Sequence, residues 1–147
     1  SGYATNLSVI STMMGRGDYV FSDKINHASI VDGCLMSGAE FRRFRHNDMA
    51  HLEGLLKNAP ADVAKLVIAD SVFSMDGDII DLPTTIALCK KYNAWLMIDE
   101  AHSVGVLGKT GRGIEEYFGI EDGIDIKMGT LSTVSYTHLT LPTSDLV

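Results

Sequence analysis

The apolar and polar positions of the chain alternate between strand spacing and helix spacing. Short apolar runs predict strands at residues 19–21, 41–45, 65–69, 95–98 and 124–128. Apolar residues three or four positions apart predict helices over 3–15, 28–37 and 83–92, and a further helix for which Asp48 is the N-cap. Strands separated by helices form βαβ units, so the pattern predicts an α/β fold with a mainly parallel sheet.

In sheets of this kind, ligands bind beyond the carboxyl ends of the strands. Polar residues follow four of the predicted strands, at 23–27, 70–74, 99–102 and 129–132. We therefore expect these four polar clusters to converge on one site.

The composition narrows the possible functions. The 147 residues carry a formal net charge of −7, which argues against general nucleic-acid binding because that requires a basic surface. The longest apolar runs are too short to span a bilayer, and no signal-peptide pattern opens the chain. Cys34 and Cys89 form no CxxC pair and are expected in the core, which fits a cytoplasmic protein. No metal site is predicted.

The segment Asp99-Glu100-Ala101-His102 follows the strand predicted at 95–98 and has three interpretations. A carboxylate fixed at a strand end can pair with a protonated ring nitrogen, and His102 can then reach a neighbouring oxygen. Alternatively, Asp99 caps the next turn and His102 is an ordinary loop histidine. The same four residue types also occur in the magnesium-binding strand of helicase-type nucleotide hydrolases. The sequence disfavours that interpretation, because the required phosphate loop would have Gly in place of Ser103 and would precede the acidic segment.

Several single residues give weaker signals. The flat ring of His27, just past a predicted strand, can stack on an aromatic cofactor, although a helix-start histidine is the simpler explanation of this residue alone. Gly2, directly before a helix, would turn free backbone N–H groups toward a phosphate. Thr130 could add a hydroxyl, although turn chemistry explains it nearly as well. The basic cluster at 42–46 is interpreted as a solvated strand face, with guidance of an anionic substrate as the alternative.

Taken together, six segments resemble the α-oxoamine synthases, a family of pyridoxal 5'-phosphate (PLP) enzymes in the aminotransferase class I/II superfamily. The match runs in order from Ser1 to Ser132, which makes the set far more specific than any single segment. The segments are Asn26-His27-Ala28-Ser29-Ile30, Arg45-His46-Asn47-Asp48, Val72-Phe73-Ser74-Met75-Asp76-Gly77-Asp78, Asp99-Glu100-Ala101-His102-Ser103, Gly111-Arg112-Gly113 and Gly129-Thr130-Leu131-Ser132.

The resemblance implies part of the large domain of a PLP fold-type I enzyme, with helices on both faces of the sheet. It also implies how the cofactor ring would be held. Asp99 would pair with the pyridine nitrogen and keep it protonated, which makes the ring an electron sink for a carbanion at the substrate α-carbon. His27 would stack on the ring face, and His102 and Ser74 would hydrogen-bond its phenolic oxygen. Asp99, His27 and His102 are thus the expected catalytic residues.

The phosphate contacts and the substrates are implied in the same way. Gly2 and Tyr3 would offer backbone N–H groups to the phosphate, and Thr130 its hydroxyl. Members of the family condense a small amino acid (glycine, alanine or serine) with an acyl-CoA, usually with loss of the carboxylate. They are homodimers with active sites at the subunit interface. A lysine that holds the cofactor as a Schiff base is the expected base.

The sequence departs from the family pattern at position 133. That pattern is Gly-Thr-(Leu/Phe)-(Ser/Gly)-Lys followed by a glycine-rich stretch, whereas here Ser132 is followed by Thr133 and by no later glycine. Threonine can neither form a Schiff base nor remove the α-proton, so we expect the chain as written to be inactive. We divide it into residues 1–132, a partial PLP-binding large domain, and residues 133–147, a non-native tail.

The tail has a specific explanation. Residues 134–143 can be encoded by GTC TCT TAT ACA CAT CTG ACG CTG CCG ACG, which matches a transposon-end adapter used to make sequencing libraries. The adapter begins with CT just before this frame, so a lysine codon cut after its first A becomes ACT, a threonine codon. The alternative is a natural non-catalytic pseudoenzyme in which Thr133 is native.

Reading codon 133 in the source DNA distinguishes these explanations. We expect a lysine codon followed by a glycine-rich stretch, because the family pattern is intact up to Ser132. A threonine codon followed by the same tail would instead establish the pseudoenzyme.

Overall fold

The computed structural model describes residues 2–73, 78–100, 114–120, 122–128 and 139–140 of the chain. Its centre is a six-stranded sheet in the order β2-β1-β3-β4-β5-β6. The first five strands run parallel, and β6 pairs antiparallel with β5. The strands are β1 (Tyr19–Asp23), β2 (Glu40–Phe44), β3 (Lys65–Asp70), β4 (Trp95–Asp99), β5 (Ile126–Met128) and β6 (Leu139–Thr140).

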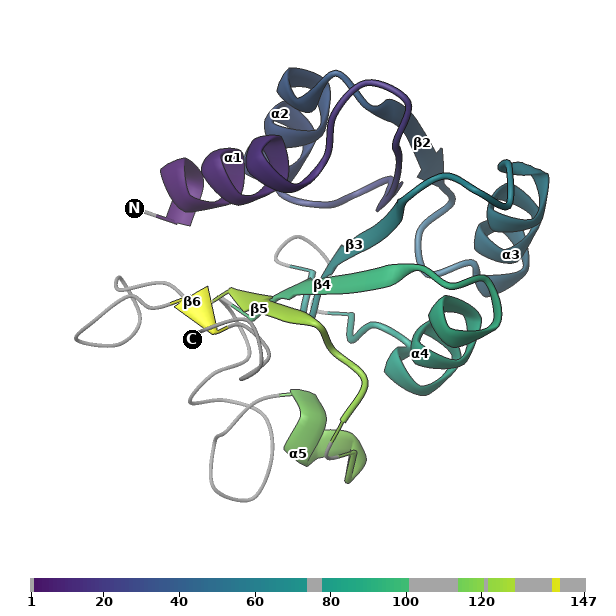
Figure 1. Cartoon of the computed structure of the whole chain (residues 1–147). Helices are drawn as coiled ribbons and strands as arrows, with labels where there is room; N and C mark the ends of the chain where they lie inside the picture. The colour runs from purple at the N-terminus through teal and green to yellow at the C-terminus, as the bar shows by residue number, and fades with distance from the viewer. Residues whose placement is uncertain (1, 74–77, 101–113, 121, 129–138, 141–147) are drawn as a thin grey trace.

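Helices cover both faces of this sheet (Figure 1). On one face, α1 (Gly2–Met13) and α2 (Ala28–Ser37) pack against each other. The opposite face carries α3 (Met49–Asn58), α4 (Leu82–Lys91) and α5 (Ile114–Phe118). The predicted α/β architecture, a mainly parallel sheet between two helical layers, is confirmed.

The two faces of the sheet have separate hydrophobic cores. Along β3, Leu66 and Ile68 belong to the core under α1 and α2, whereas Val67 and Ala69 belong to the core under the other helices. This alternation follows from the two-residue period of a strand. All six residues of β3 are buried, as expected for a central parallel strand that is covered on both faces.

Local sequence signals define the helix ends. Asp48 and Asp81 are N-caps whose carboxylates accept hydrogen bonds from the backbone N–H groups of His51 at 2.9 Å and Thr84 at 3.3 Å. At the other end of α2, Gly38 has the left-handed backbone conformation, with φ of 78°, that commonly terminates a helix.

Most predicted elements are found within about two residues of their expected bounds. The strand β5 is shorter than predicted, since it begins at Ile126 rather than at 124. The strands β1, β3 and β4 each extend further than predicted, and each ends on an aspartate. The backbone pairing of β6 lies in the segment interpreted as a non-native tail and does not test that interpretation.

The direction in which the chain winds across the sheet reverses between β1 and β3, so these two strands form a topological switch point. From β1 the chain crosses through α2 to β2, returns through α3 to β3 on the other side of β1, and then continues outward to β4 and β5. The helices that follow β1 and β3 lie on opposite faces, since α2 covers one face and α4 the other. In open α/β sheets, ligands bind at the carboxyl end of such a pair of strands.

The packing of α1 on α2 gives a stability prediction. A Cβ added at Gly33 in α2 would lie 2.9 Å from Ile10 Cδ1 and 3.2 Å from the Asn6 carbonyl oxygen, whereas nothing lies within 4 Å of one added at Gly54 in α3. Alanine is favoured over glycine in a helix by about 0.5–1 kcal/mol. We expect Gly54→Ala to raise the free energy of unfolding by that amount. Gly33→Ala should lower it by about 1 kcal/mol, because α1 must move. Urea unfolding followed by circular dichroism measures both changes, and equal stabilisation would contradict the tight contact.

Candidate functional site

Three aspartates end three neighbouring parallel strands. Asp23 closes β1, Asp70 closes β3, and Asp99 closes β4 directly opposite Asp70 in the register. Their exposed fractions are only 0%, 6% and 7%. The first residues of three predicted polar clusters therefore meet at one edge of the sheet, whereas the fourth cluster, 129–132, lies outside the described residues. Because a buried carboxylate is destabilising unless it is hydrogen-bonded, the partners of these aspartates define the site.

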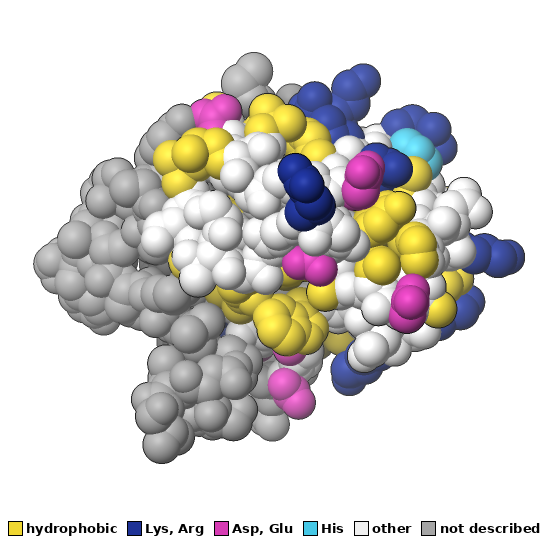
Figure 2. Space-filling view, turned by 45° about the horizontal axis from the view of Figure 1, so that its top comes forward, with side chains coloured by type: hydrophobic (Ala, Val, Ile, Leu, Met, Phe, Trp, Pro, Cys, Tyr) yellow, Lys and Arg dark blue, Asp and Glu magenta, His cyan; other side chains and the backbone are white. Residues whose placement is uncertain are grey.

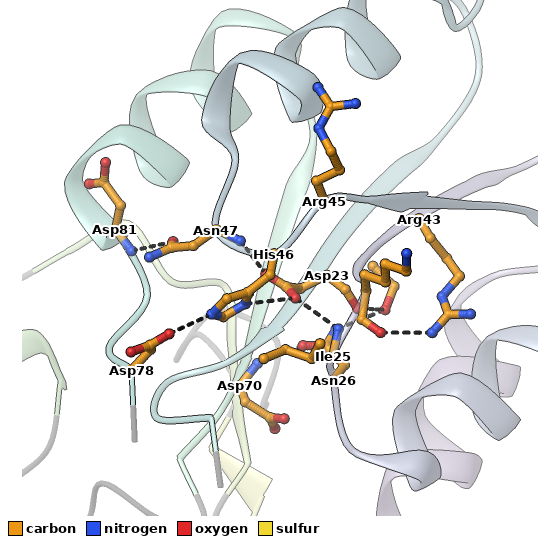
Figure 3. Close-up of polar contacts among 12 residues, drawn as sticks. Asp23, Ile25, Asn26, Arg43, Arg45, His46, Asn47, Asp70, Asp78 and Asp81 are labelled. Carbon is orange, nitrogen blue, oxygen red and sulfur yellow. Dashed lines mark hydrogen bonds and ion pairs between the residues drawn. The ribbon is translucent and has the colours of Figure 1, made fainter. Parts of the chain in front are cut away.

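The side chain of Asn26 connects the loop after β1 to the end of β3 by two hydrogen bonds. Its amide nitrogen donates to the Ile68 carbonyl at 2.9 Å, and its amide oxygen accepts from the Asp70 N–H at 3.1 Å. The backbone N–H of His27 in turn donates to Asp70 Oδ2 at 2.9 Å. These bonds place His27, the N-cap of α2, at the switch point between β1 and β3 (Figure 3 labels Asn26 and Asp70).

Asp99 is held by a residue of α1. Asn6 Nδ2 donates to Asp99 Oδ2 at 3.0 Å and to Ser29 Oγ at 2.8 Å. Asn6 lies about one turn inside α1, so the start of that helix, with Gly2 and Tyr3, lies at the same edge of the sheet. The unpaired N–H groups of a helix start favour an anion such as a phosphate.

The carboxyl group of Asp70, at this edge of the sheet, has a strongly raised pKa. Burial raises its pKa from the ordinary 3.8 to about 7, and the negative charges of Asp99 and Asp23 act in the same direction. The N–H of His27 opposes the rise by stabilising the charged form. The site therefore contains a carboxyl group that gains and loses its proton near neutral pH.

His46 forms a second polar cluster on the other side of Asp23 (Figure 3). Its Nδ1 lies 3.2 Å from Asp23 Oδ1, and its Nε2 lies 2.9 Å from Asp78 Oδ2. Partial burial lowers the pKa of His46, but the hydrogen bonds to Asp78 and Asp23 outweigh burial and raise it above 6.5. The imidazole also packs edge-to-face with the ring of Phe73, with 4.5 Å between the ring centroids. His46 thus joins the end of β1 to the residues on either side of the segment 74–77.

The predicted basic cluster at 42–46 contains exposed local ion pairs. Arg42 pairs with Glu40 at 3.0 Å, and Arg45 pairs with Asp48 at 2.9 Å. In Figure 2 the Lys and Arg side chains are spread around the visible face among Asp and Glu side chains. This arrangement fits the solvated strand face better than a surface that guides an anionic substrate.

Glu100 connects β4 to the elements that follow it. Its backbone N–H donates to the Met128 carbonyl at 2.7 Å, and its Oε1 accepts from the Ile114 N–H at 3.0 Å. The carboxylate is buried, with the whole residue 5% exposed. In the segment Asp99-Glu100, the second acidic residue therefore holds the start of α5 near the end of β4.

Several predicted site residues lie outside the described residues, namely Ser74, His102, Thr130 and Thr133. For Gly2 and Tyr3 the structure describes only their place at the start of α1. The sequence analysis missed Asn6, although an asparagine inside an apolar helical pattern is a signal, since it is a poor helix former.

This fold, with a buried aspartate at the end of a central parallel strand, is that of part of a PLP fold-type I large domain. The aminotransferase class I and II family model matches residues 1–135, and the chain belongs to this family. Its relatives place it with the α-oxoamine synthases, which confirms the resemblance found in the sequence. The nucleotide-hydrolase alternative receives no support from them.

Two curated relatives illustrate the similarity. The 8-amino-7-oxononanoate synthase of Citrifermentans bemidjiense is 55% identical over 131 residues, which are 89% of this chain and 34% of that protein. A putative 8-amino-7-oxononanoate synthase of Halalkalibacterium halodurans is 56% identical over 132 residues, 90% of this chain and 33% of that protein. The chain thus spans about a third of the length of these relatives.

Solved structures show the same similarity. A serine palmitoyltransferase from S. paucimobilis, with a bound PLP–myriocin aldimine, superposes with a TM-score of 0.86 at 47% identity, covering 90% of this chain and 34% of that one. The 8-amino-7-oxononanoate synthase of Francisella tularensis gives a TM-score of 0.76 at 35% identity, covering 90% of this chain and 37% of that one.

The described side chains fit PLP. The buried carboxylate of Asp99 can pair with a protonated ring nitrogen, and the start of α1 can receive a phosphate at the same edge. Over the described ranges, no three His, Cys, Asp or Glu side chains are grouped to hold a metal ion. In the same ranges no helix is long and apolar enough to cross a membrane.

The raised pKa of Asp70 predicts a pH dependence of stability. The folded chain holds this proton more tightly than the unfolded chain, so the stabilisation is complete below about pH 4 and is lost as the pH rises to about 7. At roughly 1.4 kcal/mol per pKa unit, the loss amounts to about 4 kcal/mol. Asp70→Asn keeps an acceptor for the His27 N–H but cannot titrate, so the variant should lose this slope and be more stable than the parent at pH 8.

Urea unfolding at half-unit steps from pH 4 to pH 8 measures the difference between variant and parent. Asp62→Asn, the same change at an exposed position, is the control and should leave the slope unchanged. Parallel pH profiles for the parent and Asp70→Asn would contradict the assignment.

Proposed function

We propose that the protein to which this chain belongs is a PLP-dependent acyltransferase. It condenses a small amino acid (glycine, alanine or serine) with an acyl-CoA to give an α-oxoamine, usually with loss of the carboxylate. The observation that carries the proposal is Asp99, which is buried at the end of β4 and hydrogen-bonded by Asn6 beside the turn that bears His27. The named activities of the relatives favour this condensation over the other reactions of the superfamily.

The proposal gives each of the site residues a task. The Asp99 carboxylate holds a proton on the pyridine nitrogen of the cofactor, and its burial strengthens that charge pairing. When bound, PLP supplies an electron sink for negative charge at the amino-acid α-carbon. The ring of His27 packs on the cofactor face, and the N–H groups of Gly2 and Tyr3 bind the phosphate. Ser74, His102 and Thr130 complete the set on the strength of the family motif.

Position 133 decides whether the chain itself is active. Thr133 has no amine to hold the cofactor covalently and no basic group to remove the α-proton, so the chain as written lacks both functions. A native lysine at this position is part of the proposal, as are a cytoplasmic homodimer and active sites shared between subunits. Thr133 itself favours a second candidate, a non-catalytic protein of the same fold that retains cofactor or partner binding.

The test uses the full-length protein with lysine at position 133. We expect a visible absorption band from bound PLP, release of free CoA from acyl-CoA only when the amino acid is present, and no ATP hydrolysis. Asp99→Asn should lower the rate of CoA release roughly a hundredfold or more, because a buried charge opposite the cofactor is lost. Asp62→Asn, at an exposed position, should leave the rate unchanged. CoA release that does not require PLP, or an Asp99→Asn variant at full rate, would overturn the proposal.

A further inference from the structure

A buried chain of polar side chains runs from Asp99 to His27 through Asn6 and Ser29. Asn6 Nδ2 lies 3.0 Å from Asp99 Oδ2 and 2.8 Å from Ser29 Oγ, and Ser29 Oγ lies 2.9 Å from His27 Nδ1. Asn6 and Ser29 are each 1% exposed. One residue of α1 and one of α2 thereby connect Asp99 and His27, the two residues that contact the cofactor ring in the proposed function.

The amide of Asn6 has one acceptable orientation. Its two N–H protons are directed to Asp99 and to Ser29, and the Asp99 carboxylate can only accept. Turning the amide over would bring its oxygen against the carboxylate oxygen, which is repulsive. Asn6 therefore restrains the rotation of the Asp99 carboxylate about its Cβ–Cγ bond.

The direction of the remaining hydrogen bonds fixes His27. The backbone N–H of Ser29 donates to His27 Nδ1 at 3.1 Å, so this nitrogen acts as an acceptor. The Ser29 hydroxyl then also donates to Nδ1 and accepts from Asn6. In the neutral ring, the proton consequently lies on Nε2, and the ring plane is held by two donors.

The amide at position 6 has a cost as well as two hydrogen bonds. Among the described residues, Asn6 Oδ1 is a buried atom without a hydrogen-bond partner. Such an atom destabilises a fold, and asparagine is a poor residue inside a helix. What the amide contributes in return is the pair of hydrogen bonds from Nδ2 to Asp99 and Ser29.

From this geometry we propose that Asn6 is a positioning residue, which orients the Asp99 carboxylate toward the cofactor ring nitrogen and, through Ser29, orients the ring of His27. The inference rests on the proposed function, because it concerns how this chain binds PLP. Asn6 acts on the ring nitrogen of the cofactor through Asp99 and on the ring face through Ser29, so only the effect through Asp99 depends on the ring nitrogen.

The first experiment measures binding of two probes to the 147-residue chain by equilibrium dialysis. One probe is PLP, and the other is its carbocyclic analogue, in which CH replaces the pyridine nitrogen. We expect the parent to bind PLP roughly tenfold or more tightly than the analogue, because only PLP can donate to Asp99. In Asn6→Leu this ratio should approach one, whereas in Asn58→Leu, the same change at an exposed position, it should equal that of the parent.

The ratio separates positioning from folding. A variant that is partly unfolded binds both probes more weakly by the same factor, so only a change in the orientation of Asp99 changes the ratio. Ser29→Ala, which removes a single hydroxyl, is the second variant. This variant should keep the preference for PLP but bind both probes more weakly by the same factor, since the ring of His27 loses one of its donors.

A second measurement does not depend on ligand binding or on a variant. Long-range proton–nitrogen NMR spectra of the parent should show His27 as a single neutral tautomer with the proton on Nε2. The tautomer with the proton on Nδ1 would overturn the inferred direction of the chain of hydrogen bonds, and with it the inference.

The remaining outcomes distinguish the inference from the proposed function. If the parent prefers PLP and Asn6→Leu keeps the same ratio, Asn6 has no positioning role and the proposed function stands. If the parent binds neither probe, cofactor binding by this chain fails, and the inference fails with it.

Discussion

Asp23, Asp70 and Asp99 are buried beside one another at the ends of three parallel strands, where little of each residue is exposed to water that could supply the hydrogen bonds a carboxylate needs. The donors come instead from the protein. The side-chain amide of Asn6 donates to Asp99, and the backbone N–H of His27 donates to Asp70. None of these donors belongs to the strand that carries its aspartate, so satisfying the carboxylates brings together α1, the loop after β1 and the start of α2.

Asp23 organises the outer part of the same edge. Its carboxylate accepts from the backbone N–H groups of Ile25 at 2.9 Å and Asn47 at 2.8 Å, and contacts the ring of His46. Since His46 also reaches Asp78, the connections after β1, β2 and β3 are held to one another. A ligand at the switch point would thus meet a surface whose loops are fixed by buried charge.

The same electrostatics separates the chemical roles of two adjacent aspartates. Asp99 and Asp70 are opposite each other in the register, and two negative charges so close in a buried place are unfavourable. Burial and the neighbouring charge raise the pKa of Asp70 to about 7, and the Asn6 amide donates a hydrogen bond to Asp99. Asp70 thus supports the turn of His27, and Asp99 is the carboxylate that the proposed function assigns to the ring nitrogen.

The sequence by itself determined the order of helices and strands, the parallel sheet and the polar clusters at the strand ends, because these follow from local periodicity and capping. It also indicated the family, since six segments matched in order. Only the tertiary structure decided that Asn6 meets Asp99, 93 positions away, and that His46 lies between Asp23 and Asp78. Such pairs depend on strand order and on how helices pack, and a linear pattern contains neither.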